Sequence, residues 1–151
     1  MDTIPLPTDF KEFLRFLNAR SVEYLLIGGF SVAYHGYPRA TGDMDIWIAM
    51  SPENAQNVVD ALADFGFTQS VTGWMVDLFQ EPNRLARMGN PPLRIEIHTT
   101  ISGVVFADCY PRRESAILDG VPVGIISKPD LRANKAASGR LKDQNDLENL
   151  P

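Results

Sequence analysis

The stretch Tyr24-Leu-Leu-Ile-Gly-Gly-Phe-Ser31 is followed, 11 residues later, by Asp43-Met-Asp-Ile46. The first stretch predicts a buried strand that ends in two glycines, where the backbone turns tightly and can approach a ligand closely. The helix expected next would offer free N–H groups to an anion, and the Ser31 hydroxyl would add to them. Asp43 and Asp45 are two residues apart on a second expected strand, so both side chains project from one face.

These features together predict the chemistry of phosphoryl or nucleotidyl transfer. Two adjacent carboxylates repel one another unless a cation lies between them, and hard oxygen ligands favour Mg²⁺. An anion-binding turn beside such a metal site is what this class of reaction requires. Glu96 would supply a third carboxylate from a neighbouring strand. Each feature alone has a simpler interpretation, a turn for the glycines and a solvated strand position for Glu96, so the prediction depends on their combination.

Three segments of the chain resemble the nucleotidyltransferase superfamily, which has the DNA polymerase β-like palm. Residues 24–46 are similar to its signature, and the pattern His-Gly-x-x-Arg-x-Thr-x-Asp at residues 35–43 resembles the minimal branch that includes abortive-infection type IV toxins. Residues 93–103 resemble the strand that carries the third acid. Residues 127–150 resemble the C-terminal Lys and Lys-Asp motifs of those toxins. The resemblance implies the nucleotidyltransferase fold.

The resemblance also implies an activity and assigns roles by position. It implies a Mg²⁺-dependent enzyme that transfers NMP from an NTP to an acceptor hydroxyl and releases pyrophosphate, with two bound ions and Mn²⁺ as an alternative metal. The catalytic and metal-binding carboxylates would be Asp43, Asp45 and Glu96. The triphosphate would lie against Gly28, Gly29, Ser31 and Lys135, and Asp143 would support the site.

Five further residues have a structural interpretation, and three of them have a functional one as well. Arg39 precedes the acidic pair and is predicted to contact a phosphate, or else to form a surface ion pair. His98 shares the face of Glu96 and could reach a substrate, or be a hydrogen-bonded strand histidine. Trp47 could stack on a base or belong to the core. His35 is expected to cap or pack its helix, and Cys109, which has no nucleophile constellation around it, to be a small buried residue.

Hydrophobic periodicity and turn residues predict the remaining elements. Met44, Ile46 and Ile48 alternate with Asp43, Asp45 and Trp47, and Leu93, Ile95 and Ile97 with Arg94, Glu96 and His98. Asp119-Gly120 signals a hairpin. Helices are expected over residues 8–20, 30–37, 52–65 and from 129 to the end with a break near Gly139, and strands over 22–27, 43–50, 75–79, 84–88, 93–99, 116–118 and 121–126. The fold class is therefore α+β, a mixed sheet with flanking helices in a single domain over residues 1–151.

Composition excludes several classes of protein. Lysine and arginine number 14 against 19 aspartates and glutamates, a net charge of −5, which is unfavourable for a duplex-DNA binder. The single cysteine allows no intramolecular disulfide and is typical of a reducing cytosol. The acidic N-terminus does not resemble a signal peptide, and no apolar stretch approaches the roughly 20 residues of a membrane span. We therefore expect a soluble cytoplasmic protein.

The acceptor is left open: an RNA end, a protein hydroxyl or a small-molecule hydroxyl would each serve. Two macromolecular partners are candidates: a second copy of the chain in a homodimer, and an antitoxin-type protein. The rival function is a catalytically silent palm-like binding module that acts as a toxin–antitoxin partner or regulator. A metal-dependent glycosyltransferase that uses Asp-x-Asp for a nucleotide sugar fits less well, because it leaves Gly28-Gly-Phe-Ser31 unexplained.

Overall fold

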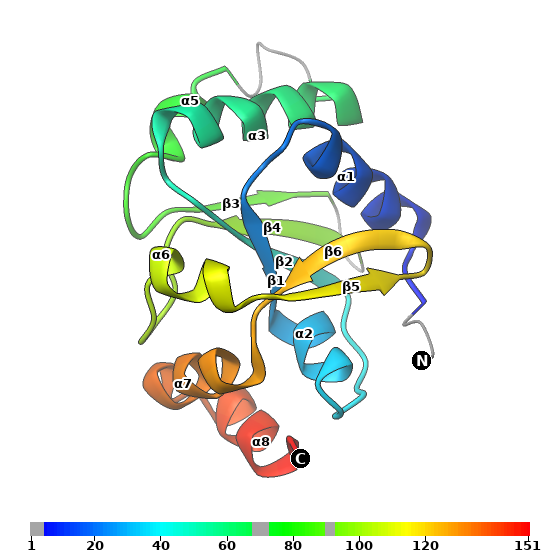
Figure 1. Cartoon of the computed structure of the whole chain (residues 1–151), viewed down its shortest axis with the longest axis vertical. Coiled ribbons are helices and arrows are strands. Elements are labelled where there is room, and N and C mark those ends of the chain that lie inside the picture. Colours follow the sequence, from blue (N-terminus) through cyan, green and yellow to red (C-terminus); the bar gives the residue numbers. More distant parts are fainter. Residues whose placement is uncertain (1–4, 68–72, 90–92) are drawn as a thin grey trace.

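A computed structural model describes residues 5–67, 73–89 and 93–151 of the chain. Within them, one mixed sheet has the strand order β3-β4-β2-β1-β6-β5 (Figure 1). The central β2 runs antiparallel to β1 and parallel to β4, and β1 runs parallel to β6. The strand bounds are β1 Tyr24–Ile27, β2 Asp43–Ile48, β3 Leu85–Met88, β4 Arg94–His98, β5 Glu114–Leu118 and β6 Val121–Ile125.

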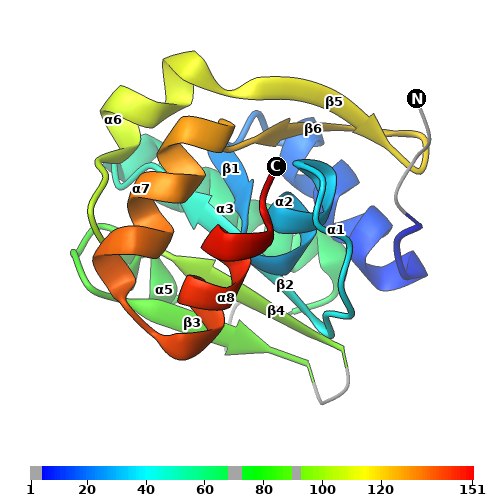
Figure 2. The same ribbon diagram turned by 90° about the horizontal axis from the view of Figure 1, so that it is seen from below.

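Helices cover both faces of this sheet. Figure 1 shows α1 and α3 above the sheet and α2, α7 and α8 below it, and Figure 2 gives the view from the side of α7 and α8. The short α5 and α6 lie in the connections between strands. The helix bounds are α1 Thr8–Ala19, α2 Gly28–Tyr34, α3 Pro52–Phe65, α5 Met75–Leu78, α6 Phe106–Cys109, α7 Lys128–Ser138 and α8 Leu141–Asn149, and a 3₁₀ turn spans Tyr110–Arg112.

The alternation of β2 and β4 separates the core from the opposite face. Met44 pairs with Ile95 and Ile46 with Ile97 across the parallel ladder, and all four side chains are buried in the core below α1 and α3. The residues between them, including Asp45 and its ladder partner Glu96, therefore point to the side of α7 and α8. Burial of the apolar face fixes the register, because a slip of one residue would turn every side chain to the wrong side.

Most predicted elements are confirmed, with two differences. The hairpin of β5 and β6 turns at Asp119 and Gly120, both at positive φ, as the Asp-Gly pair predicts. The predicted strand over residues 75–79 is wrong, because Met75–Leu78 forms the helix α5. The stretch is mostly apolar and too short for its hydrophobic period to distinguish a helix from a strand. The helix expected from residue 30 begins at Gly28, directly after β1. Among the described residues, no helix has the length and apolar character that a membrane span needs.

Candidate active site

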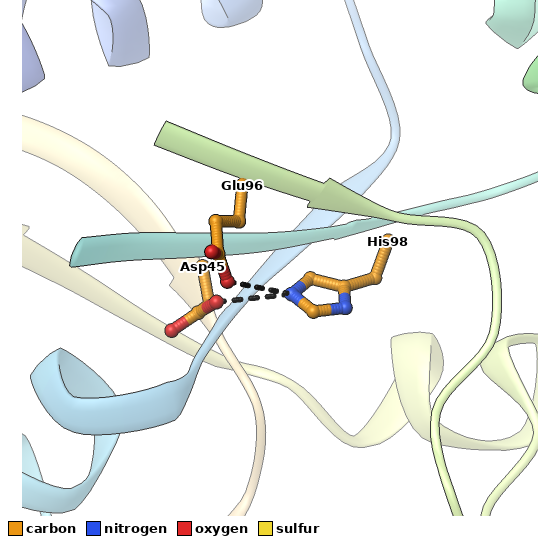
Figure 3. Close-up of side chains that lie close together, drawn as sticks. All are labelled: Asp45, Glu96 and His98. Carbon is orange, nitrogen blue, oxygen red and sulfur yellow. Dashed lines mark hydrogen bonds and ion pairs between the residues drawn. The ribbon is translucent and has the colours of Figure 1, made fainter. Parts of the chain in front are cut away.

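Carboxylates from two neighbouring strands meet on the α7 and α8 side of the sheet. Asp45 and Glu96 are direct partners in the parallel β2–β4 ladder, and their side chains lie on the same face (Figure 3). Oxygen atoms of both groups and a ring nitrogen of His98 all lie within 4.8 Å of one another. The structure thus brings together two of the three predicted catalytic carboxylates, one from each strand.

His98 completes this group, two residues after Glu96 on β4. Its Nε2 lies 2.9 Å from Asp45 Oδ1 and 3.9 Å from Glu96 Oε1 (Figure 3). The alternation of β4 predicts that His98 shares a face with Glu96, but only the pairing of β4 with β2 brings the ring to Asp45. His98, for which the sequence left open a substrate contact or a hydrogen-bonded strand position, is therefore a direct neighbour of Asp45 and Glu96.

Asp43 lies two residues from Asp45 and lines the same cavity, but an arginine holds its carboxylate. Arg94 Nε is 3.4 Å from Asp43 Oδ1, across the β2–β4 ladder in which the two residues are partners. Among the described residues, the group of converging donors contains His98 and not Asp43. The predicted set of three carboxylates is present at the cavity, with Asp43 beside the cluster of Asp45, Glu96 and His98.

Burial and hydrogen bonds shift the two clustered carboxylates in opposite directions. Burial disfavours the charge on Asp45, but hydrogen bonds with His98 and Glu96 outweigh it and hold the pKa of Asp45 below its usual value. Burial and the hydrogen bond with Asp45 raise the pKa of Glu96, against the lowering effect of Arg87. Arg87 reaches Glu96 from the neighbouring strand β3, where its Nε donates to Glu96 Oε2 at 2.8 Å. Asp45 is thus the more acidic member of the pair and Glu96 the more basic.

The turn after β1 brings the backbone directly against Asp45. Gly28 has φ +69°, and a Cβ at this position would overlap the Asp45 carboxylate, so glycine is required here. Gly29 faces elsewhere, because a Cβ there would overlap the Thr41 side chain. The Ser31 hydroxyl is buried and donates to the Gly28 carbonyl at 2.7 Å. Of the three residues predicted to form the triphosphate turn, Gly28 is the one that lines the cavity.

A cluster of ion pairs joins α7, α8 and the segment before β2. Lys135 is 4% exposed, and its Nζ lies 2.9 Å from Asp143 Oδ1 and 3.0 Å from Asp146 Oδ2. Arg39 pairs through two nitrogens with Asp146 at 2.8 and 2.9 Å, so its ion pair has a buried partner. Arg140 pairs with Asp143 at 2.8 Å. We call Lys135, Asp143, Asp146, Arg39 and Arg140 the α7–α8 cluster.

The α7–α8 cluster keeps its two aspartates ionised. Burial opposes the charge on both, but hydrogen bonds outweigh it, from Arg140 to Asp143 and from Arg39 and Lys135 to Asp146. The pKa of Asp143 is held far below its usual value, and that of Asp146 is lowered as well. Asp143, predicted to support the site, pairs with Lys135, which lines the cavity. The predicted phosphate ligands Lys135 and Arg39 are both held by carboxylates.

One cavity of about 370 Å³ joins these groups. The sheet side of its wall carries Asp43, Asp45, Glu96 and His98, and the side of α7 and α8 carries Asn134, Lys135, Arg140 and Lys142. Carboxylates thus face cationic side chains across the cavity. Arg140 and Lys142 were assigned no role from the sequence, although both lie in the stretch that resembles the C-terminal Lys and Lys-Asp motifs.

The other candidates have structural positions. Trp47 is buried, donates from Nε1 to the Thr99 carbonyl at 3.3 Å and packs edge-on against Phe106. His35 is buried, with Nε2 2.7 Å from the Ile126 carbonyl oxygen. Cys109 is buried as expected, and burial raises the pKa of its thiol to about 11. These positions match the structural interpretation in each case.

The overall structure is similar to that of a protein from Thermotoga maritima described as a "putative nucleotidyltransferase". The likeness has a TM-score of 0.60 at 14% sequence identity and covers 92% of this chain and 88% of the other. Comparisons with protein-family models and with curated proteins gave no match. The structural likeness nevertheless extends over nearly the whole chain. The chain therefore has the nucleotidyltransferase fold that residues 24–46 predicted.

Proposed function

We propose that the protein is a metal-dependent nucleotidyltransferase that transfers NMP from an NTP to an acceptor hydroxyl and releases pyrophosphate. One observation carries the proposal: the carboxylates of Asp45 and Glu96 meet at a cavity whose opposite wall is cationic. This charge pattern suits a triphosphate, which needs positive charge around its oxygens and a counter-ion between it and the carboxylates. The nucleotidyltransferase fold supports the same assignment.

The residues of the cavity fit a divalent cation. Asp45, Glu96 and His98 offer three converging donor atoms, and Asp43 adds a carboxylate at the cavity wall. In this proposal Asp43, Asp45 and Glu96 hold the divalent ions expected from the sequence, Mg²⁺ or Mn²⁺. A bound divalent ion would stabilise negative charge on the α-phosphate and lower the pKa of the acceptor hydroxyl.

Two carboxylates of different basicity divide the remaining work between them. Asp45 stays ionised through its hydrogen bonds and is suited to a permanent negative charge beside a cation. Glu96, the more basic of the two before a cation binds, is the group that would accept the proton of the attacking hydroxyl when it is not itself a metal ligand. The proton on the acceptor oxygen would pass to Glu96 as that oxygen attacks the α-phosphorus, and pyrophosphate would leave.

The opposite wall would bind the β- and γ-phosphates. Arg140 and Lys142 line the cavity together with Lys135. Lys142 is exposed, and Arg140 is exposed although it also pairs with Asp143, whereas Lys135 is buried between two aspartates. We therefore assign direct phosphate contact to Lys142 and Arg140. Lys135 would hold α7 and α8 in register behind them and add positive charge at the cavity wall.

The pattern at residues 35–43 supports a place within the minimal, toxin-like branch of the superfamily. On that basis the acceptor would be an RNA end, a protein hydroxyl or a small-molecule hydroxyl. A second copy of the chain or an antitoxin-type protein would be the partner, and the cytoplasm the compartment. A silent binding module is the alternative, although Asp43, Asp45 and Glu96 are all present.

Incubation with each α-labelled NTP tests this function. The protein would be mixed with Mg²⁺ or Mn²⁺ and, separately, with total RNA, a protein extract and aminoglycosides. We expect label in one acceptor pool, released pyrophosphate in equal amount, and loss of both with EDTA. Absence of label from every pool with either ion would favour the binding module.

A further inference from the structure

The imidazole of His98 points at the place where the two acids meet. Figure 3 shows the ring directed from the end of β4 toward Asp45 and Glu96, with the same nitrogen, Nε2, nearest to both. The distances from Nε2 are 2.9 Å to the Asp45 oxygen and 3.9 Å to the Glu96 oxygen. One nitrogen and two oxygens from three residues therefore converge on a single point at the cavity.

This spacing is compatible with ligands that share one cation. Neighbouring ligands of an octahedral ion at about 2.1 Å lie roughly 3 Å apart, so small side-chain movements would bring all three donors into range. The strands fix the backbone positions of all three residues. Asp45 and Glu96 are ladder partners, and His98 follows Glu96 by two residues on the same face. Gly28 closes the group on the opposite side, where its backbone lies against the Asp45 carboxylate.

We propose that His98 is a metal ligand, and that Asp45, Glu96 and His98 form a mixed nitrogen–oxygen site that binds a divalent transition ion such as Mn²⁺ in preference to Mg²⁺. The inference rests on the proposed function and deepens it, since it names the class of ion that the same site takes. Mg²⁺ demands oxygen donors in near-ideal octahedral geometry, whereas imidazole is a donor for first-row transition ions, of which Mn²⁺ is the one that also suits carboxylate oxygens. One imidazole among the donors therefore shifts the selectivity of the site away from Mg²⁺.

The competing explanation is that His98 only donates a hydrogen bond to Asp45 and keeps its carboxylate charged. Both explanations predict that loss of His98 lowers activity, so activity does not separate them. A direct bond between the metal and the ring nitrogen does, because only a ligand nitrogen couples strongly to the electron spin of bound Mn²⁺. Assignment of the coupled nitrogen is simple, because the chain contains two histidines. The other one, His35, is hydrogen-bonded to the Ile126 carbonyl.

The test uses protein labelled with [¹⁵N]histidine and loaded with Mn²⁺, with and without a non-hydrolysable NTP. Pulsed electron paramagnetic resonance should show ¹⁵N coupling in the wild type and in Thr100→Ala, a control that alters the same cavity wall. His98→Ala should lose the coupling. Titration of His98→Ala should show an Mn²⁺ affinity at least about tenfold lower than that of the wild type, which is the lower end of the loss that a disturbed metal site suffers. Mg²⁺ affinity should change much less, so that the preference for Mn²⁺ falls.

Three outcomes would overturn the inference. These are wild-type protein that binds no Mn²⁺ in either sample, bound Mn²⁺ without ¹⁵N coupling, or a His98→Ala variant with an unchanged ratio of Mn²⁺ to Mg²⁺ affinity. The proposed function fails separately: ¹⁵N coupling without label transfer to any acceptor would leave His98 a ligand in a protein that is not a transferase. Label transfer without ¹⁵N coupling would keep the transferase and remove His98 from the metal.

Discussion

Gly28 shows how closely the backbone and the acidic cluster are fitted together. Its positive φ and its contact with the Asp45 carboxylate are two separate demands for glycine. Gly28→Ala should therefore lower the free energy of unfolding by the left-handed backbone cost of about 1–2 kcal/mol and by a further clash. Gly120→Ala is the matched control, because Gly120 has φ +84° and no atom within 4 Å of an added Cβ.

Urea unfolding of both variants separates the two demands. We expect Gly120→Ala to show the backbone cost alone, and Gly28→Ala at least twice that loss together with weaker Mn²⁺ binding. Equal losses in the two variants, with metal binding intact, would show that the approach of Gly28 to Asp45 has no energetic consequence.

Lys135, predicted to contact the triphosphate, lies buried between two aspartates. Lys135→Met would remove the cation that two buried carboxylates share, but each keeps an arginine partner, so the cost should be on the order of 2 kcal/mol, below that of a fully broken buried pair. Lys142→Met removes an exposed charge from the same cavity wall and should change the free energy of unfolding by less than about 0.5 kcal/mol. Chemical denaturation and NTP titration of both variants check this.

We expect Lys142→Met to weaken NTP binding without loss of stability and Lys135→Met to lose stability first. A Lys135→Met variant as stable as the wild type would show that the ion pairs of Lys135 with Asp143 and Asp146 do not stabilise the fold.

The carboxylates of α8 form ion pairs with Lys135 of α7 and with Arg39, so the free energy of unfolding should fall in acid. Asp143 and Asp146 have folded-state pKa values below those of the unfolded chain, so their contribution to stability is complete above about pH 4, the pKa of an unfolded aspartate, and falls as the pH drops below it. Asp146→Asn should cost about 3 kcal/mol at pH 7. The same substitution should cost about 1 kcal/mol less at pH 3, where the wild type has begun to lose this contribution.

Urea unfolding of the wild type and of Asp146→Asn at the two pH values measures the difference. An equal cost at pH 7 and pH 3 would mean that the charge of Asp146 does not hold α8.

The strands and most helices could be predicted because local signals coincide there. The alternation of β2 and β4 assigned Asp45, Glu96 and His98 to faces, and Ser51, whose hydroxyl caps α3 at Asn54 N, and the terminal Gly66 marked the two ends of that helix. The stretch 75–79 was misassigned because five residues, four of them apolar, are too few to show a helical or a strand period.

The site was harder to predict, because it depends on which strands are neighbours. No local pattern says that β4 pairs with β2 in a register that sets Glu96 beside Asp45. The same holds for Arg94, which pairs with Asp43 beside the converging group, and for Lys135, which is buried between Asp143 and Asp146 where α7 packs on α8. The sequence thus predicted the candidate carboxylates but not their partners.

The whole molecule places a sheet surface of carboxylates opposite a helical surface of cations, with both held on rigid elements. This arrangement suits a charged substrate that is bound between the two surfaces, as a nucleoside triphosphate would be. A binding module would need the same fold but not the same acids. The distinction between the two functions therefore depends on a change at one acid that preserves the fold.

The rate of label transfer by Asp45→Asn makes that distinction. Asparagine keeps the shape of Asp45 and an oxygen for the hydrogen bond with His98, so the melting temperature should stay within about 4 °C of the wild type, equivalent to roughly 1 kcal/mol. Loss of the ligand charge should reduce transfer on the order of a thousandfold. Asp77→Asn, at an exposed aspartate of α5, should transfer at the wild-type rate. A folded Asp45→Asn variant that transfers label as fast as the wild type would contradict a nucleotidyl-transfer site at this cavity.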